Sequence, residues 1–121
     1  MSRVENLNKV LRSLQSGSPD VEACALISED GLMIASALPA HIEEARVAGM
    51  SATLLGLGTR ATKELERGQL EEVLIRGANG FAVMLDSGSG TLLLALASKE
   101  AKLGLLFLDM RRAVEDVRRI L

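Results

Sequence analysis

The chain has 121 residues, of which 48% are hydrophobic and 25% are charged, and its formal net charge is −2. This composition fits one folded domain spanning residues 1–121 and excludes a disordered tail. Nucleic acid is not an expected partner, because Phe81 and Phe107 are the only aromatic residues and basic charge is not in excess. The apolar runs are too short for a membrane span, and the N-terminal segment lacks the apolar core of a signal peptide. We therefore expect a cytoplasmic protein with no membrane span.

Apolar residues at three- and four-residue spacing predict an amphipathic helix over residues 4–14. Two apolar runs, residues 21–28 and 32–36, follow as predicted strands, and the Asp-Gly pair between them is typical of a β-hairpin turn. Cys24 is the only cysteine and lies inside the first of these strands. A free cysteine in such a run usually packs as a small buried hydrophobe, so we expect Cys24 to be part of the core.

A long helical pattern then covers residues 42–66 and ends before a glycine. Three strands are predicted at residues 70–76, 81–86 and 91–98, and the short glycine-rich connections between them favour an antiparallel meander. Apolar residues at helical spacing predict a closing helix over residues 103–121. The predicted order is α-β-β-α-β-β-β-α, an α+β fold.

The three strands of the meander differ in pattern. Residues 81–85 and 92–97 are apolar at every position, which predicts central strands with helices on both faces of the sheet. Residues 70–76 carry charges beside their apolar side chains and lie at one end of the meander, so we predict an exposed edge that can pair with a second strand. The residues predicted to form this dimer edge are Glu71, Glu72, Val73, Leu74 and Ile75.

The predicted middle helix is apolar on two sides. We interpret the side with the larger residues as the core stripe, formed by Val47, Met50, Leu54, Leu57, Ala61 and Leu65. Small residues on the other side predict a surface for a second copy or a protein partner, formed by Ala45, Ala48, Gly49, Ala52, Leu55, Gly56 and Thr59. Arg46 and Arg60 flank this surface as candidate charged contacts. A poorly optimised solvent face, or a helix covered on both sides within one chain, would also explain the pattern.

Catalytic and metal-binding motifs are not evident in the sequence. His41 is the only histidine, so one chain cannot build a Ser-His-Asp triad or a histidine-rich metal site. Residues 77–80 and 87–90 are glycine-rich but lack the Gly-Lys-Ser/Thr ending of a phosphate-binding loop, and we interpret them as turns. We expect no enzyme activity and no cofactor. An arginine finger, supplied to a GTPase by Arg46 or Arg60, is a weaker interpretation than solvated charges beside an interface.

Three segments together resemble a known family. They are the apolar hairpin at residues 22–35, the Ala-, Gly- and Leu-rich helix at residues 48–60, and Leu103-Gly-Leu-Leu-Phe-Leu108 followed by Arg111 and Arg112. Their order and spacing resemble the Roadblock/dynein light chain domain family over nearly the whole chain. The resemblance implies a profilin-like α/β/α sandwich, with a five-stranded antiparallel sheet between the middle helix and the two terminal helices.

The same resemblance implies a homodimer, in which residues 70–76 of two copies pair across a twofold axis and the middle helices lie side by side. It also implies a non-catalytic adaptor or regulator of a small Ras-like GTPase, of the gliding-motility type in bacterial relatives. The alternative function is a small-ligand sensor with an internal pocket. We favour it less, because fully apolar central strands offer few convergent polar groups.

Overall fold

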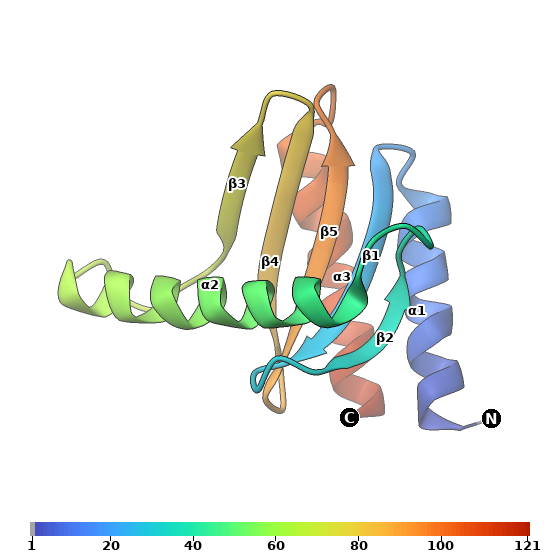
Figure 1. Cartoon of the computed structure of the whole chain (residues 1–121), viewed down its shortest axis with the longest axis horizontal. Helices are drawn as coiled ribbons and strands as arrows, with labels where there is room; N and C mark the ends of the chain where they lie inside the picture. Colours follow the sequence, from blue (N-terminus) through green and yellow to red (C-terminus); the bar gives the residue numbers. More distant parts are fainter. Residues whose placement is uncertain (1) are drawn as a thin grey trace.

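The computed structural model describes residues 2–121 and places one antiparallel sheet between two helical layers (Figure 1). The chain follows the predicted order, with elements α1 (Arg3–Gly17), β1 (Val21–Ser28), β2 (Met33–Ala37), α2 (Glu44–Glu64), β3 (Val73–Gly77), β4 (Gly80–Gly88), β5 (Thr91–Ser98) and α3 (Leu103–Ile120). The five strands lie side by side in the order β2-β1-β5-β4-β3. The predicted fold class is confirmed.

The larger part of the core lies between the sheet and the α1/α3 layer. Leu7, Leu11 and Leu14 form the buried side of α1, at the helical spacing that the sequence predicted. The start of α1 is capped, because the Ser2 hydroxyl accepts a hydrogen bond from the Glu5 backbone N–H at 3.1 Å. The matching residues of α3 are Leu106, Met110, Ala113, Val114 and Val117.

Cys24 lies in this core with no exposed surface, as predicted. Its thiol donates a hydrogen bond to the Leu11 carbonyl at 3.3 Å, which ties β1 to α1. Burial raises the pKa of the Cys24 thiol from 9.0 to about 11, because the charged thiolate would lose its hydration there. A thiol held in its neutral form is a poor nucleophile, so this cysteine has a structural role.

The opposite face of the sheet carries a smaller core under α2. The buried residues of this second cluster are Ala25, Ile27, Ala48, Met84, Leu92 and Leu94. Figure 1 shows α2 crossing the sheet near the end with the β1–β2 and β4–β5 turns and then continuing past β3. Only part of this face is therefore covered by the chain's own helix.

Candidate functional site

The strand β3 lies at one edge of the sheet, as predicted, and pairs with β4 alone. Leu74 and Ile75 remain 43% and 40% exposed there. The strand begins at Val73, so the predicted start at residue 70 is wrong, and Glu71 and Glu72 precede it. Glu72 instead lies 4.0 Å from Arg111 of α3, with which it forms an ion pair. The free edge is therefore the short segment Val73–Gly77.

The register of the β3–β4 hairpin decides which backbone groups of β3 are free. Gly77 lies opposite Gly80 across a two-residue turn, and such turns are flanked by a hydrogen-bonded pair. Bonded and non-bonded pairs alternate from there, so the backbone groups of Val73 and Ile75 point toward β4. The N–H and C=O groups of Leu74 and Arg76 point away from β4, toward whatever approaches this edge.

The structure agrees with the predicted orientation of α2 only in part: Val47 and Leu54 of the predicted core stripe pack against the core, but so do residues of the predicted outward side. Ala48 is completely buried and Ser51 is 2% exposed, and both face the sheet. Ala52 and Leu55 also pack against the core beneath. Placing Ala48, Ala52 and Leu55 on an outward surface was therefore wrong. The helix lies close to the sheet, and small side chains are the ones that fit in that narrow space.

The outward side of α2 is formed instead by part of the predicted core stripe. Met50 and Leu57 are 55% and 58% exposed. Four members of the predicted partner surface do lie on or beside this outward side: Ala45, Gly56 and Thr59 are exposed and Gly49 is half-buried. Exposed large apolar side chains of a helix are typical of a surface that another protein covers. We name this surface, formed by Ala45, Gly49, Met50, Gly56, Leu57 and Thr59, the outer α2 surface.

The two candidate arginines, Arg46 and Arg60, are exposed on α2, and each is already paired with a glutamate close to it in the sequence. Arg46 lies 3.5 Å from Glu43, and Arg60 lies 3.8 Å from Glu64. All four side chains are at least 66% exposed. Exposed pairs of this kind contribute only about 0.2–1 kcal/mol, so either arginine can leave its partner at little cost when another charged surface approaches.

Part of the sheet on the α2 side is not covered by the helix. The β1–β2 turn rests against the Gly49 side of α2, so the opposite side, with Leu54, Ala61 and Leu65, faces the uncovered area. Ile75, Ala82 and Leu96 form a row across three neighbouring strands there. None of these three is fully buried, and Leu65 is 67% exposed. An apolar row of the sheet and an apolar flank of the helix thus both remain partly exposed on this side of the molecule.

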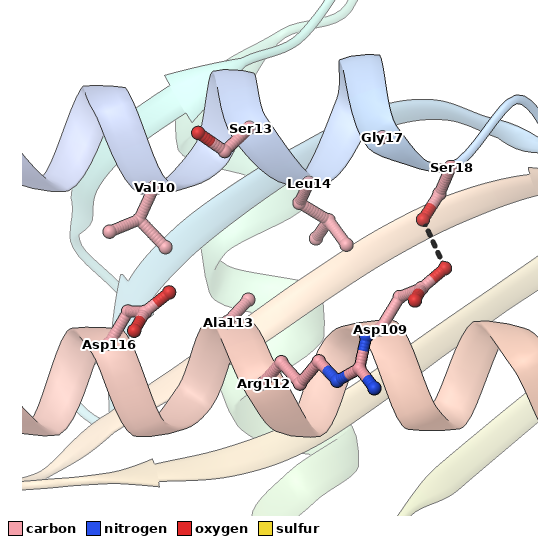
Figure 2. A pocket seen from close by; sticks show the side chains of 9 residues that line it. All are labelled: Val10, Ser13, Leu14, Gly17, Ser18, Asp109, Arg112, Ala113 and Asp116. Carbon is pink, nitrogen blue, oxygen red and sulfur yellow. Dashed lines mark hydrogen bonds between the residues drawn. The ribbon is translucent and has the colours of Figure 1, made fainter.

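A separate groove lies on the other face of the molecule, between α1 and α3 (Figure 2). Its floor is formed by Val10, Leu14 and Ala113, and its rim carries Asp109, Arg112 and Asp116 among other residues. The groove is open and holds about 230 Å³, below the roughly 300 Å³ at which small-molecule pockets usually begin. The Ser18 hydroxyl donates a hydrogen bond to Asp109 at one end.

Other predicted features occupy positions with a simple structural explanation. His41 lies exposed in the connection before α2. Residues 77–80 and 87–90 form the turns of the β3–β4 and β4–β5 hairpins. Within residues 2–121, no three His, Cys, Asp or Glu side chains gather closely enough to hold a metal ion. None of the helices in this part of the chain is long and apolar enough to cross a membrane.

Comparison with known proteins identifies relatives with the same architecture. The family model of the Roadblock/LC7 domain matches residues 7–97. The uncharacterized protein MJ1340 of Methanocaldococcus jannaschii is 31% identical over 112 residues, which cover 93% of this chain and 96% of that protein. A Roadblock/LC7 domain from Streptomyces avermitilis superposes with a TM-score of 0.85 at 25% identity, covering 93% of this chain and 94% of its own. MglB from Myxococcus xanthus superposes with a TM-score of 0.90 at 20% identity, covering 99% and 90% of the two chains.

Proposed function

Because this chain belongs to the Roadblock/LC7 domain family, we propose that it is a non-catalytic homodimeric adaptor that binds and regulates a small Ras-like GTPase. The observation that carries the proposal is that β3 leaves a free sheet edge while α2 extends beyond it (Figure 1). Both features lie on the same side of the molecule. In a single chain the outer edge of β3 has no strand to pair with, and the end of α2 has no sheet beneath it. A cytoplasmic location, which the free cysteine favours, belongs to the same proposal.

Pairing of two β3 strands about a twofold axis perpendicular to the sheet completes both features. The outward backbone groups of Leu74 and Arg76 gain partners, and the two sheets become one. The same rotation brings the overhanging end of each α2 over the uncovered part of the other sheet, beside Ile75 and Ala82. Each α2 then presents its Leu65 side to the other helix.

Rough energies support pairing that uses both the strand and the helix. Leu65, Leu74 and Ile75 are 67%, 43% and 40% exposed, and full burial of such a side chain contributes roughly 1.5–3 kcal/mol. Counting about half of that for each residue, twice in a symmetric dimer, gives on the order of 6 kcal/mol. Association costs about 4–15 kcal/mol, so the side chains alone are marginal and the backbone hydrogen bonds of β3 are needed as well.

The outer α2 surface is the proposed contact for the GTPase. In the dimer two such surfaces lie next to each other, with Met50 and Leu57 of each copy between the flanking charges of Arg46 and Arg60. A Ras-like GTPase changes the conformation of its switch segments with the bound nucleotide. We therefore expect the contact to distinguish the triphosphate from the diphosphate form, with Arg46 and Arg60 released from their exposed ion pairs.

The dimer is tested by light scattering over a concentration series. We expect a stable mass near 26 kDa, about twice the 12.9 kDa chain. The substitution Leu74→Pro removes a backbone donor at the free edge and should give a folded monomer. Leu74→Thr keeps that donor and is the matched control, which should remain dimeric. A strict monomer for the unaltered chain would contradict the proposal.

The partner is tested by titrating the chain with purified Ras-like GTPases of its source organism, loaded with GDP or a non-hydrolysable GTP analogue. Calorimetry should detect binding to one GTPase in its triphosphate form. The double substitution of Met50 and Leu57 by Glu should abolish that binding while the mass of the dimer is unchanged. Failure of every such GTPase to bind in either nucleotide state would overturn the proposed partner, and the dimer could still stand.

A further inference from the structure

The outward side of α3 carries two leucines with no partner in the chain. Leu105 and Leu108 are 56% and 42% exposed, on the side of the helix opposite the buried Met110 and Val117. They are spaced three residues apart, so they form one short stripe along the helix. Figure 1 shows α3 and α2 on opposite faces of the sheet, so the outward sides of the two helices lie on opposite faces of the molecule.

Basic side chains continue the stripe at both ends. Lys102 precedes Leu105 by three residues and Arg112 follows Leu108 by four. Within residues 2–121 neither cation lies within 4.0 Å of a carboxylate, in contrast to Arg46 and Arg60 on α2. The charges nearest the stripe on α3 and its approach also include Lys99, Glu100, Asp109, Arg111, Glu115, Asp116 and Arg119. Two of these carboxylates are already engaged: Asp109 accepts from Ser18, and Asp116 lies 2.9 Å from Arg119.

The charge of the whole chain is also unevenly distributed, with the excess of basic residues in the segments that form α1 and α3. Residues 2–17 and 102–121, which include α1 and α3, carry eight Lys or Arg and four Asp or Glu, a net charge of +4. The remaining residues carry six basic and twelve acidic side chains, a net charge of −6, which accounts for the total of −2. The α1/α3 layer is thus the positive face of an acidic protein, and its complement is an anionic surface.

From these features we propose that the outward side of α3 docks on the surface of an anionic lipid bilayer, with Leu105 and Leu108 entering the headgroup boundary. Exposed leucines bracketed by unpaired Lys and Arg are the combination that holds a helix at a charged lipid interface. An acidic peptide is a poorer occupant, because it could engage Lys102 and Arg112 but would leave Leu105 and Leu108 exposed, whereas a bilayer takes up both the charges and the leucines.

The inference rests in one respect on the proposed function, because a dimer makes the surface bivalent. A twofold axis perpendicular to the sheet leaves both α3 helices on the same side, so two stripes face the bilayer together. Two weak contacts on one rigid body bind much more tightly than one. The outer α2 surfaces then point away from the lipid, where they remain accessible to a partner.

The test is flotation of the full chain with vesicles of phosphatidylcholine alone or mixed with phosphatidylserine. We expect binding to the mixed vesicles only, weakening as salt is added. Replacing both Leu105 and Leu108 by Ser should weaken binding at least about tenfold. Lys102→Gln combined with Arg112→Gln should also weaken it. Leu32→Ser removes a leucine that is more exposed than either, at 67%, from the β1–β2 turn and is the control that should bind normally.

Two outcomes would overturn the proposal: no binding to phosphatidylserine vesicles at low salt, or binding that is unchanged by the two leucine substitutions. Equal retention on a polyglutamate resin, independent of those leucines, would assign the surface to acidic proteins instead. Light scattering of the same samples separates this proposal from the dimer. A monomer that still floats refutes the dimer alone, and a dimer that does not float refutes the lipid surface alone.

Discussion

Gly31 in the turn of the first hairpin rests directly against Gly49 of α2, because a Cβ atom on Gly31 would lie 3.4 Å from the Gly49 Cα. Gly31 also has a φ of +86°, a conformation that other residues adopt only with strain. The contact fixes how close the β1–β2 turn comes to α2. The contact requires glycine at position 31 and not at position 49, where an added Cβ would meet no atom within 4 Å.

Gly31→Ala should lower the free energy of unfolding by about 1–2 kcal/mol, because the left-handed backbone and the close contact both oppose a Cβ. Gly49→Ala is the matched control. A Cβ at Gly49 meets no atom within 4 Å, so the better helix propensity of alanine should raise stability by up to about 1 kcal/mol. Urea denaturation of the two variants measures both effects, and a loss of similar size in each would contradict this account of the contact.

The hairpin between β3 and β4 offers a second pair of glycines with different surroundings. A Cβ on Gly80 would lie 2.4 Å from the Ala97 carbonyl oxygen of β5, whereas one on Gly77 would lie 3.6 Å from the Gly80 oxygen. Gly80→Ala should therefore cost more than about 2 kcal/mol of stability, since backbone must move. Gly77→Ala should stay within about 0.5 kcal/mol of the unaltered chain. Thermal unfolding of both variants distinguishes them, and equal melting temperatures would refute the prediction.

Because of Cys24, the free energy of unfolding should depend on pH in the alkaline range. Its folded pKa of about 11 lies above the ordinary value of 9.0, so the folded state holds the proton more tightly than the unfolded state does. The stabilising contribution is complete below pH 9 and is lost as pH rises toward 11. The urea midpoint of the unaltered chain should fall across this window more steeply than that of Cys24→Ala. The chain has no tyrosine to titrate there, and parallel curves would show that the thiol is not responsible.

The orientation of α2 can be tested with one substitution made at two positions. Ala48→Leu adds volume at a completely buried site and should cost about 1–3 kcal/mol. Ala45→Leu makes the same change on the exposed side of the same helix and should alter stability by less than about 0.5 kcal/mol. Losses below about 0.5 kcal/mol from both variants, measured by denaturant unfolding, would instead support the orientation predicted from the sequence, in which both alanines face outward.

The element order and the sheet edge followed from local patterns in the sequence. Glycine-rich turns separate the strands of the meander, and the change from the fully apolar pattern of residues 92–97 to the charged pattern of residues 70–76 distinguished a central strand from an edge. These features are readable because burial on both faces requires apolar residues at every position, whatever the rest of the chain does. The dimer and the GTPase partner stay predictions, since they concern surfaces that a single chain leaves open.

The residue at which β3 begins is decided by contacts between segments that lie far apart in the sequence. Leu70 lies under α2, where a Cβ added to Gly58 would be 3.3 Å from its side chain, and Glu72 turns toward Arg111 of α3. Residues 70–72 are therefore held by two helices before the chain pairs with β4. Their mixture of apolar and charged side chains resembles that of an edge strand. No local pattern in the sequence indicates that these residues contact α2 and α3 instead.

The side of α2 that faces the sheet was likewise decided only by the tertiary structure. Periodicity showed that both sides of the helix are apolar, and by residue size alone the side with Met50 and Leu57 looked like the core. The sheet beneath already supplies large side chains such as Ile27, Met84 and Leu94, and the hairpin turn at Gly31 closes the space further. Ala48 and Ser51 are the fully buried residues of α2 there, so the packing of the second layer, rather than the hydrophobicity of the helix, set its orientation.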